Sequence, residues 1–178
     1  MSKKNKKPYR PKRRSEDKSR GASRLAAVQA LYQMELAGQG IDAALNEFIE
    51  HRLGREIEGE QYMEADKKYF ASLVRGVVDQ QDEVDRAIAR SVAKEWPFDR
   101  IDPTMRAILR SAAFELMSLP SVPTRIIVNE YMHIASAFFD EGEENETKKW
   151  RLGGSAFRSV EEGLTVADVA ALYLSRAM

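Results

Sequence analysis

A short stretch near the N-terminus carries side chains that could bind nucleic acid. Arg20 and Arg24 are four residues apart, so they share a helix face if a helix extends back over both. Gln29 and Tyr32 follow, adding an amide, a stacking surface and a hydroxyl. Recognition of single-stranded RNA uses phosphate charge, base stacking and base-edge hydrogen bonds. We therefore treat these residues as candidate RNA contacts. The alternatives are a core tyrosine with its hydroxyl at the rim, and a glutamine at a buried edge that bonds to a neighbour.

The charge distribution favours the same function. Residues 1–24 hold 11 Lys and Arg against two acidic residues, whereas the rest of the chain holds 17 basic and 26 acidic residues. A basic arm on an acidic body is typical of nucleic-acid contact, because Lys and Arg neutralise phosphates and release counterions. Arg13, Arg14 and Lys18 are further candidate phosphate contacts in this arm. The alternative is a solubilising tail.

Catalytic patterns are missing from the sequence. The chain has no cysteine and two histidines, with no HExxH and no phosphate-binding GxxxxGK[ST] motif. We interpret the acidic run DEGEENE as a solvated loop rather than a cation site. These observations predict a protein that is not an enzyme and holds no cofactor or metal. No apolar run reaches the roughly 18 residues of a membrane span. With the lack of cysteine, this leads us to expect a cytoplasmic protein with no membrane partner.

The elements that must position these residues follow helical periodicity. From Leu25 to Gly38 we predict a helix capped by Ser23. Its apolar stripe consists of Leu25, Val28, Tyr32 and Leu36. A second helix fits residues 41–53, and the pattern over 64–92 fits one long helix or two.

The clearest helix start is Asp102, followed by Pro103 at the first helical position. Another helix begins near Thr124, and evidence for strands is thin. The sequence thus predicts an all-α, compact helical bundle of about six or seven helices. Residues 1–20 would be a disordered basic arm, 21–140 the helical domain, and 141–178 an acidic loop and an atypical C-terminal segment that holds one helix at most.

Three stretches, in order, resemble the NusB family of bacterial transcription antitermination factors. They are RLAAVQALYQMELAG, ADKKYFASLVRGVVDQQDEVDRAI and RIDPTMRAILRSAAFELMSLPSVPTRIIVNEYMHIA. The resemblance covers about residues 20–139. The chain is similar to the family in three motifs: Q-A-L-Y-Q followed by an acidic residue, D-x-x-Y-F-x-x-L-V-x-G-V, and R-A-I-L-R.

The resemblance implies a non-catalytic factor that binds boxA RNA of ribosomal-operon leaders. The family does so with a ribosomal protein that doubles as NusE, and the complex joins RNA polymerase and promotes processive transcription. Arg20 and Arg24 stand where the family has its arginine-rich N-terminus, and Gln29 and Tyr32 match its first-helix motif. Asp102 and Met105 mark the implied surface for the protein partner, although members often have an acidic residue where Met105 stands.

Two departures and three alternatives remain open at this point. Gly21 and Ala22 stand where some members are basic, and nothing after the acidic loop matches the family's closing F-V-N-G-V-L-D helix. One alternative is a protein-binding bundle whose basic tail has only non-specific affinity for nucleic acid. A second is a detached NusB-like module related to rRNA methyltransferases. A homodimer is the alternative assembly.

Overall fold

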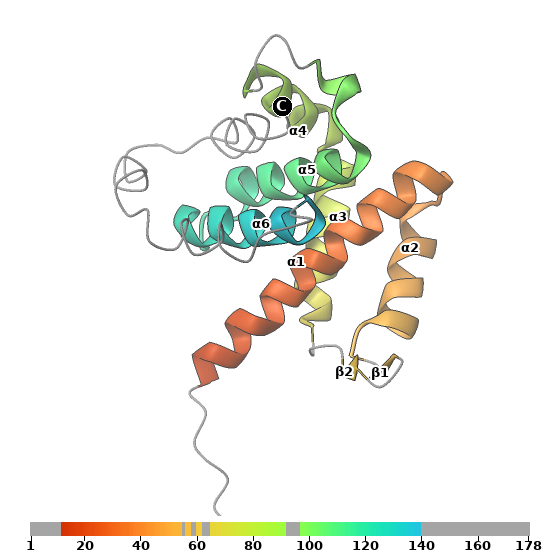
Figure 1. The fold of residues 1–178 in the computed structure, drawn as a ribbon, viewed down its shortest axis with the longest axis vertical. Helices are drawn as coiled ribbons and strands as arrows, with labels where there is room; N and C mark the ends of the chain where they lie inside the picture. The colour runs from red at the N-terminus through yellow and green to blue at the C-terminus, as the bar shows by residue number, and fades with distance from the viewer. Residues whose placement is uncertain (1–11, 55, 58–59, 62–64, 92–96, 140–178) are drawn as a thin grey trace, which may run out of the picture.

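The computed structural model describes residues 12–54, 56–57, 60–61, 65–91 and 97–139 (Figure 1). Within them lie six α-helices: α1 (Lys12–Ala37), α2 (Ile41–Glu47), α3 (Lys67–Asp79), α4 (Gln81–Ser91), α5 (Pro103–Ser118) and α6 (Thr124–Phe139). The smaller elements are a π-helical turn η1 (Phe48–Arg52), a 3-10 turn η2 (Phe98–Arg100), and the antiparallel strands β1 (Glu56–Ile57) and β2 (Glu60–Gln61). The predicted all-α helical bundle is confirmed. None of the described helices has the length and apolarity that a membrane span requires.

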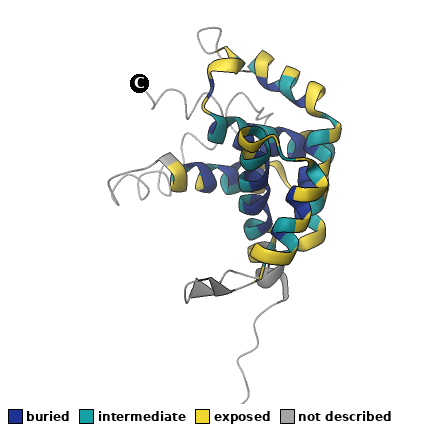
Figure 2. Cartoon of the chain, turned by 90° about the vertical axis from the view of Figure 1, so that its right-hand side faces the viewer, coloured by how far each residue is buried: buried dark blue, intermediate teal, exposed yellow. Residues whose placement is uncertain are grey.

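Helix α1 crosses the middle of the molecule (Figure 1). It packs most extensively against α5 and α3, and it also contacts α2 and α6. Helix α6 packs on α5, and α4 packs on α5 at the far end of the bundle from the start of α1 (Figure 1). The buried faces turn inward on all of these helices, while the outer faces are exposed (Figure 2). Helix α1 is therefore the element through which the others are connected.

Local signals place the helix ends. The carboxylate of Asp102 accepts hydrogen bonds from the backbone N–H of Thr104 and Met105, and Pro103 opens α5 as predicted. Gly38 ends α1 with a φ of +63°, which a residue with a side chain rarely adopts. The pattern over residues 64–92 resolves into two helices, α3 and α4, separated at Gln80.

Helix α1 begins earlier than we predicted. It starts at Lys12, so residues 12–20 are helical rather than disordered, and residues 1–11 lie outside the described part. Ser23 is therefore not a cap: its hydroxyl lies inside the helix, 3.0 Å from the Ser19 carbonyl oxygen and 2.9 Å from that of Asp66. Extending a formed helix adds one hydrogen bond for each residue ordered, so it costs far less than starting one. Packing of Ser19 and Ser23 against the start of α3 favours the extension.

The buried side of α1 also differs from the predicted apolar stripe. The side chains in the core are mostly small: Ala26, Ala27, Val28, Ala30 and Leu31. Tyr32 and Leu36, which the stripe placed in the core, are 37% and 59% exposed. Small side chains allow neighbouring helices to approach a central helix closely. Side-chain size, rather than hydrophobicity alone, thus sets which side of α1 faces inward.

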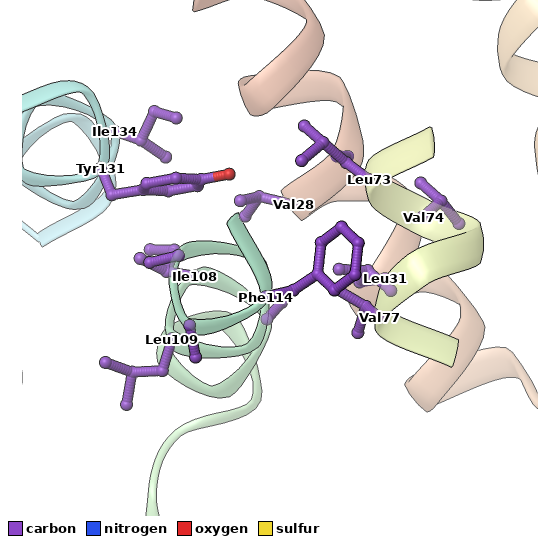
Figure 3. Close-up of a cluster of buried hydrophobic side chains, with 14 of the residues drawn as sticks. Val28, Leu31, Leu73, Val74, Val77, Ile108, Leu109, Phe114, Tyr131 and Ile134 are labelled. Carbon is purple, nitrogen blue, oxygen red and sulfur yellow. The ribbon is translucent and has the colours of Figure 1, made fainter. Parts of the chain in front are cut away.

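Figure 3 shows the core where α1, α3, α5 and α6 meet. Val28 and Leu31 of α1 lie beside Leu73, Val74 and Val77 of α3, with Ile108, Leu109 and Phe114 of α5 and Tyr131 and Ile134 of α6 completing the cluster. Phe114 packs directly on Gly76, where an added Cβ would lie 1.9 Å from the ring atom Cζ. The glycine makes room for the ring between α3 and α5.

Candidate nucleic-acid interface

Three of the predicted RNA contacts lie on one solvent-facing side of α1. At 100° per residue, Lys18, Gln29 and Tyr32 fall within about 60° of one another. Lys18 is exposed, Gln29 is half-buried, and Tyr32 is 37% exposed. Lys18 and Tyr32 are separated by about 21 Å along the axis at 1.5 Å per residue. We call these three residues the α1 face. They offer positive charge, an amide and an aromatic ring on a rigid helix.

Arg20 lies on a different side of α1, at its junction with α3. Its guanidinium carbon is 5.1 Å from the centre of the Tyr69 ring, within the range of a cation–π contact. The backbone N–H of Asp66 donates to the Ser19 carbonyl oxygen at 3.4 Å, which brings the start of α3 against α1. Arg20 itself is exposed, so its charge is accessible to a phosphate. Arg13 and Arg14 belong to α1, but their side chains lie outside the described part.

Arg24 does not lie where the predicted RNA contact requires it. Its side chain is only 2% exposed, so it does not contribute to a surface that contacts RNA phosphates. Its Nε and one terminal nitrogen donate to the Glu115 carboxylate at 2.9 and 2.6 Å, and that same nitrogen donates to the Tyr69 hydroxyl at 3.0 Å. Its other terminal nitrogen lies 3.6 Å from Glu130. Arg24 thus ties α1 to α3, α5 and α6.

Glu115 is the centre of this buried cluster. It has no exposed surface and accepts hydrogen bonds from Arg24 and from the hydroxyls of Tyr69 and Tyr131. The Tyr131 hydroxyl also lies 2.9 Å from that of Ser111. In the described part of the chain, every buried side-chain nitrogen and oxygen has a partner. A charge inside a protein is tolerated only when it is paired and hydrogen-bonded, and this cluster meets that condition.

The pKa values in the cluster follow from burial and pairing. Burial raises the pKa of Tyr131 well above its ordinary value, and the Glu115 charge raises it further. Burial and the hydrogen bond to Glu115 raise the pKa of Tyr69 in the same way. Burial alone would lower the pKa of Arg24, but the hydrogen bond to Glu115 and its charge outweigh burial and raise that pKa. Near neutral pH the two tyrosines therefore remain protonated donors and Arg24 remains a cation.

Sequence reasoning did not assign Tyr69 or Glu115 a role. Both lie inside the motifs that resemble the NusB family, Tyr69 in DKKYF and Glu115 in FELMSL. The available signal was spacing: Arg24 is four residues before the buried Val28, and Glu115 is three after the buried Ala112. A charged residue on a buried helix face requires a buried partner, so the spacing indicated that each residue has one but not which residue it is.

The predicted partner surface at α5 divides into two parts. Asp102 is exposed, and its carboxylate caps the helix. Met105 is 8% exposed and belongs to the hydrophobic core, so the prediction that it forms part of a partner surface is wrong. It lies one turn into α5, where its side chain turns inward with those of Ile108 and Leu109.

The two histidines are exposed and occur on different elements, His51 in η1 and His133 in α6. Among the described residues, no group of three or more His, Cys, Asp or Glu side chains is arranged to hold a metal ion. The acidic run DEGEENE and the C-terminal segment lie outside the described part.

Comparison with known proteins agrees with the motifs. The model of the NusB family matches residues 21–145, more than half of the chain. The chain belongs to the NusB family. A NusB transcription antitermination protein of Caulobacter vibrioides is 52% identical over 126 residues, covering 71% of this chain and 84% of the relative. NusB of Brucella anthropi is 49% identical over 124 residues, covering 70% of this chain and 74% of that one. The chain is accordingly a transcription antitermination factor of the NusB family.

A solved structure supports the fold of this NusB-family chain. The structure described as a plectonemic RNA supercoil contains a chain that superposes with a TM-score of 0.59. The match covers 89% of this chain and 96% of that one, at 21% sequence identity. At that identity the likeness concerns the fold alone.

Proposed function

We propose that this chain is a non-catalytic regulator that binds boxA-type single-stranded RNA from ribosomal-operon leaders. In this proposal it acts together with the ribosomal protein NusE and joins the antitermination complex on RNA polymerase in the cytoplasm. The observation that carries the proposal is the α1 face, where Lys18, Gln29 and Tyr32 lie together on the surface of a rigid helix. Family membership supports a regulatory role.

Tyr32 is central to the RNA-binding part of the proposal. Its ring is 37% exposed although the sequence pattern suits a core position. An exposed ring on a helix offers a base a stacking surface at little cost in conformational entropy, because the backbone beneath it is already ordered. Gln29 is three residues away on the same face and can bond to a base edge, while Lys18 and Arg20 supply charge for phosphates.

The protein partner is proposed to bind near the start of α5. Asp102 is exposed there, whereas Met105 supports the helix from inside. Self-association is the competing assembly. Sedimentation of the chain with and without the ribosomal protein separates the two, because a homodimer forms without the partner.

Replacing Tyr32 with Ala tests the role of the α1 face. Base stacking on an aromatic side chain is worth about 1–3 kcal/mol, so we expect boxA RNA to bind about 5- to 150-fold more weakly. Tyr32 is 37% exposed, so thermal stability should fall less than it would on loss of a fully buried tyrosine. Fluorescence anisotropy with labelled RNA and a melting curve measure the two effects.

Met117→Ala is the matched control. Met117 lies on α5 and is 41% exposed, which is close to the exposure of Tyr32. The substitution therefore removes a similarly exposed side chain from a helix other than α1. We expect it to leave RNA affinity unchanged. Unchanged affinity in Tyr32→Ala, or an equal loss in both variants, would contradict RNA contact through Tyr32.

A further inference from the structure

Helix α3 begins with two lysines, at positions where their charge does not stabilise the helix. Lys67 and Lys68 are its first two residues, directly after the capping Asp66, and both are exposed. The N-terminus of a helix carries partial positive charge, so cations in the first turn are unfavourable. In the described part of the chain, neither lysine forms an ion pair with an acidic side chain. Their presence is therefore not explained by the stability of the fold.

The start of α3 is fixed against α1 next to Arg20. The Asp66 backbone N–H donates to the Ser19 carbonyl oxygen, and the Ser23 hydroxyl lies 2.9 Å from the Asp66 carbonyl oxygen. Tyr69, whose ring lies under the Arg20 guanidinium, directly follows Lys68. Adjacent Cα atoms are about 3.8 Å apart, so the backbone of both lysines lies close to that of Tyr69.

Charge accumulates at this junction. Arg20, Lys67 and Lys68 are all exposed there, whereas Lys18 lies on the α1 face. The Asp66 carboxylate accepts the backbone N–H groups of Lys68 and Tyr69, and Glu130 lies 3.6 Å from the buried Arg24 guanidinium. Among the described residues, these two acidic groups thus have partners of their own, and the three exposed cations leave a basic surface that spans two helices.

We propose that RNA bound on α1 continues onto the first turn of α3, where Lys67 and Lys68 contact its phosphates. This inference rests on the proposed RNA binding and extends it to a second helix. The two lysines act through charge together with Arg20, whose guanidinium is held on the Tyr69 ring. The expected consequence is a contribution to affinity that does not depend on base sequence but does depend on salt.

The double variant Lys67→Ala with Lys68→Ala tests the proposal in the full chain. Each phosphate contact to a single strand contributes about 0.7 to the slope of log affinity against log salt, so the slope should become shallower by about 1.4. The RNA affinity of the unchanged chain, divided by that of the double variant, should then fall about sevenfold between 50 and 200 mM salt. The melting temperature should stay equal or rise, because two unfavourable cations leave a helix N-terminus.

Two further variants act as controls. Arg86→Ala with Arg90→Ala removes two exposed cations from α4, whose side chains donate to carbonyl oxygens of their own helix, and it should leave the slope unchanged. Lys67→Arg with Lys68→Arg keeps the charge and should retain the slope of the unchanged chain.

The outcomes separate this inference from the proposed function. If the unchanged chain binds boxA RNA and the alanine variant keeps the same slope, the contact with α3 is overturned while RNA binding stands. An equal loss of slope in the α4 variant would also overturn it, since the effect would then reflect net charge alone. If the unchanged chain binds no RNA, the proposed function and this extension both fail.

Discussion

At the scale of single residues, Arg24 and Arg20 show how similar side chains four positions apart take different roles. Arg24 is enclosed by Glu115, Tyr69 and Glu130, whereas Arg20 is exposed. The guanidinium carbons of both residues lie over the Tyr69 ring, that of Arg20 at 5.1 Å and that of Arg24 at 5.4 Å from its centre. The types of these residues predicted RNA contacts for both; Arg24 instead forms an internal ion pair, and the RNA contact of Arg20 stays a prediction. Only the fold reveals which contact is internal, because Glu115 is 91 residues from Arg24 along the chain.

Removing Glu115 tests the internal role of this pair. Glu115→Ala leaves the Arg24 charge buried without its partner, and loss of one member of a buried pair costs about 3–5 kcal/mol. Urea unfolding should show that loss as a lower transition midpoint. Glu47→Ala, which breaks an exposed pair with Arg52, should have a much smaller effect. Equal losses in the two variants would mean that the Arg24–Glu115 pair does not hold the helices together.

At the scale of elements, ion pairs explain why separate sequence motifs occur together. Glu35, the acidic residue that follows QALYQ in α1, accepts hydrogen bonds from Arg106 and Arg110, the two arginines of RAILR in α5. Arg110 also binds the Asp85 carboxylate of α4 at 2.7 and 2.8 Å. Helices α1, α4 and α5 are thus joined by one network. The motifs could be read from the sequence, but their pairing required the positions of the helices.

Helix positions were predictable where hydrophobicity and caps agreed. Asp102, Pro103 and Gly38 all set helix ends as predicted. The inward side of α1 was not predictable in the same way, because its core residues are mainly alanines and the larger Tyr32 and Leu36 turn outward. A pattern weighted by hydrophobicity favours large residues, whereas a central helix needs small ones where neighbours approach closely.

The contact of Gly76 with Phe114 gives a prediction at this scale. Gly76→Ala would gain up to about 1 kcal/mol in helix propensity, but the new Cβ would lie 1.9 Å from the ring. Displacing the ring should cost more than that gain, giving a net loss of about 1–3 kcal/mol in unfolding free energy. Gly40→Ala is the control, since a Cβ there meets nothing within 4 Å and its φ of −70° suits alanine; its one expected cost is the preference for glycine over alanine at the N-cap of α2. A stable Gly76→Ala variant would show that α3 and α5 can separate without cost.

At the scale of the whole molecule, the bundle places charge on a rigid support. The chain has a formal net charge of zero, yet its basic residues concentrate toward the N-terminus. Because α1 extends back to Lys12, part of that basic segment belongs to the helix that organises the core. Composition predicted the charge asymmetry and the helical class. It could not predict that α1 and the start of α3 would share one basic surface, since that depends on packing between residues more than 40 positions apart.

Binding of boxA RNA across a range of salt, with and without the ribosomal protein NusE, tests the central claim most directly. We predict tighter binding to boxA than to a scrambled strand of equal composition, a steep loss of affinity as salt increases, and higher affinity when NusE is present. Equal affinity for both strands, a flat response to salt and no effect of NusE would contradict specific RNA binding by this protein. That result would leave a helical bundle whose basic segment attracts nucleic acid without specificity.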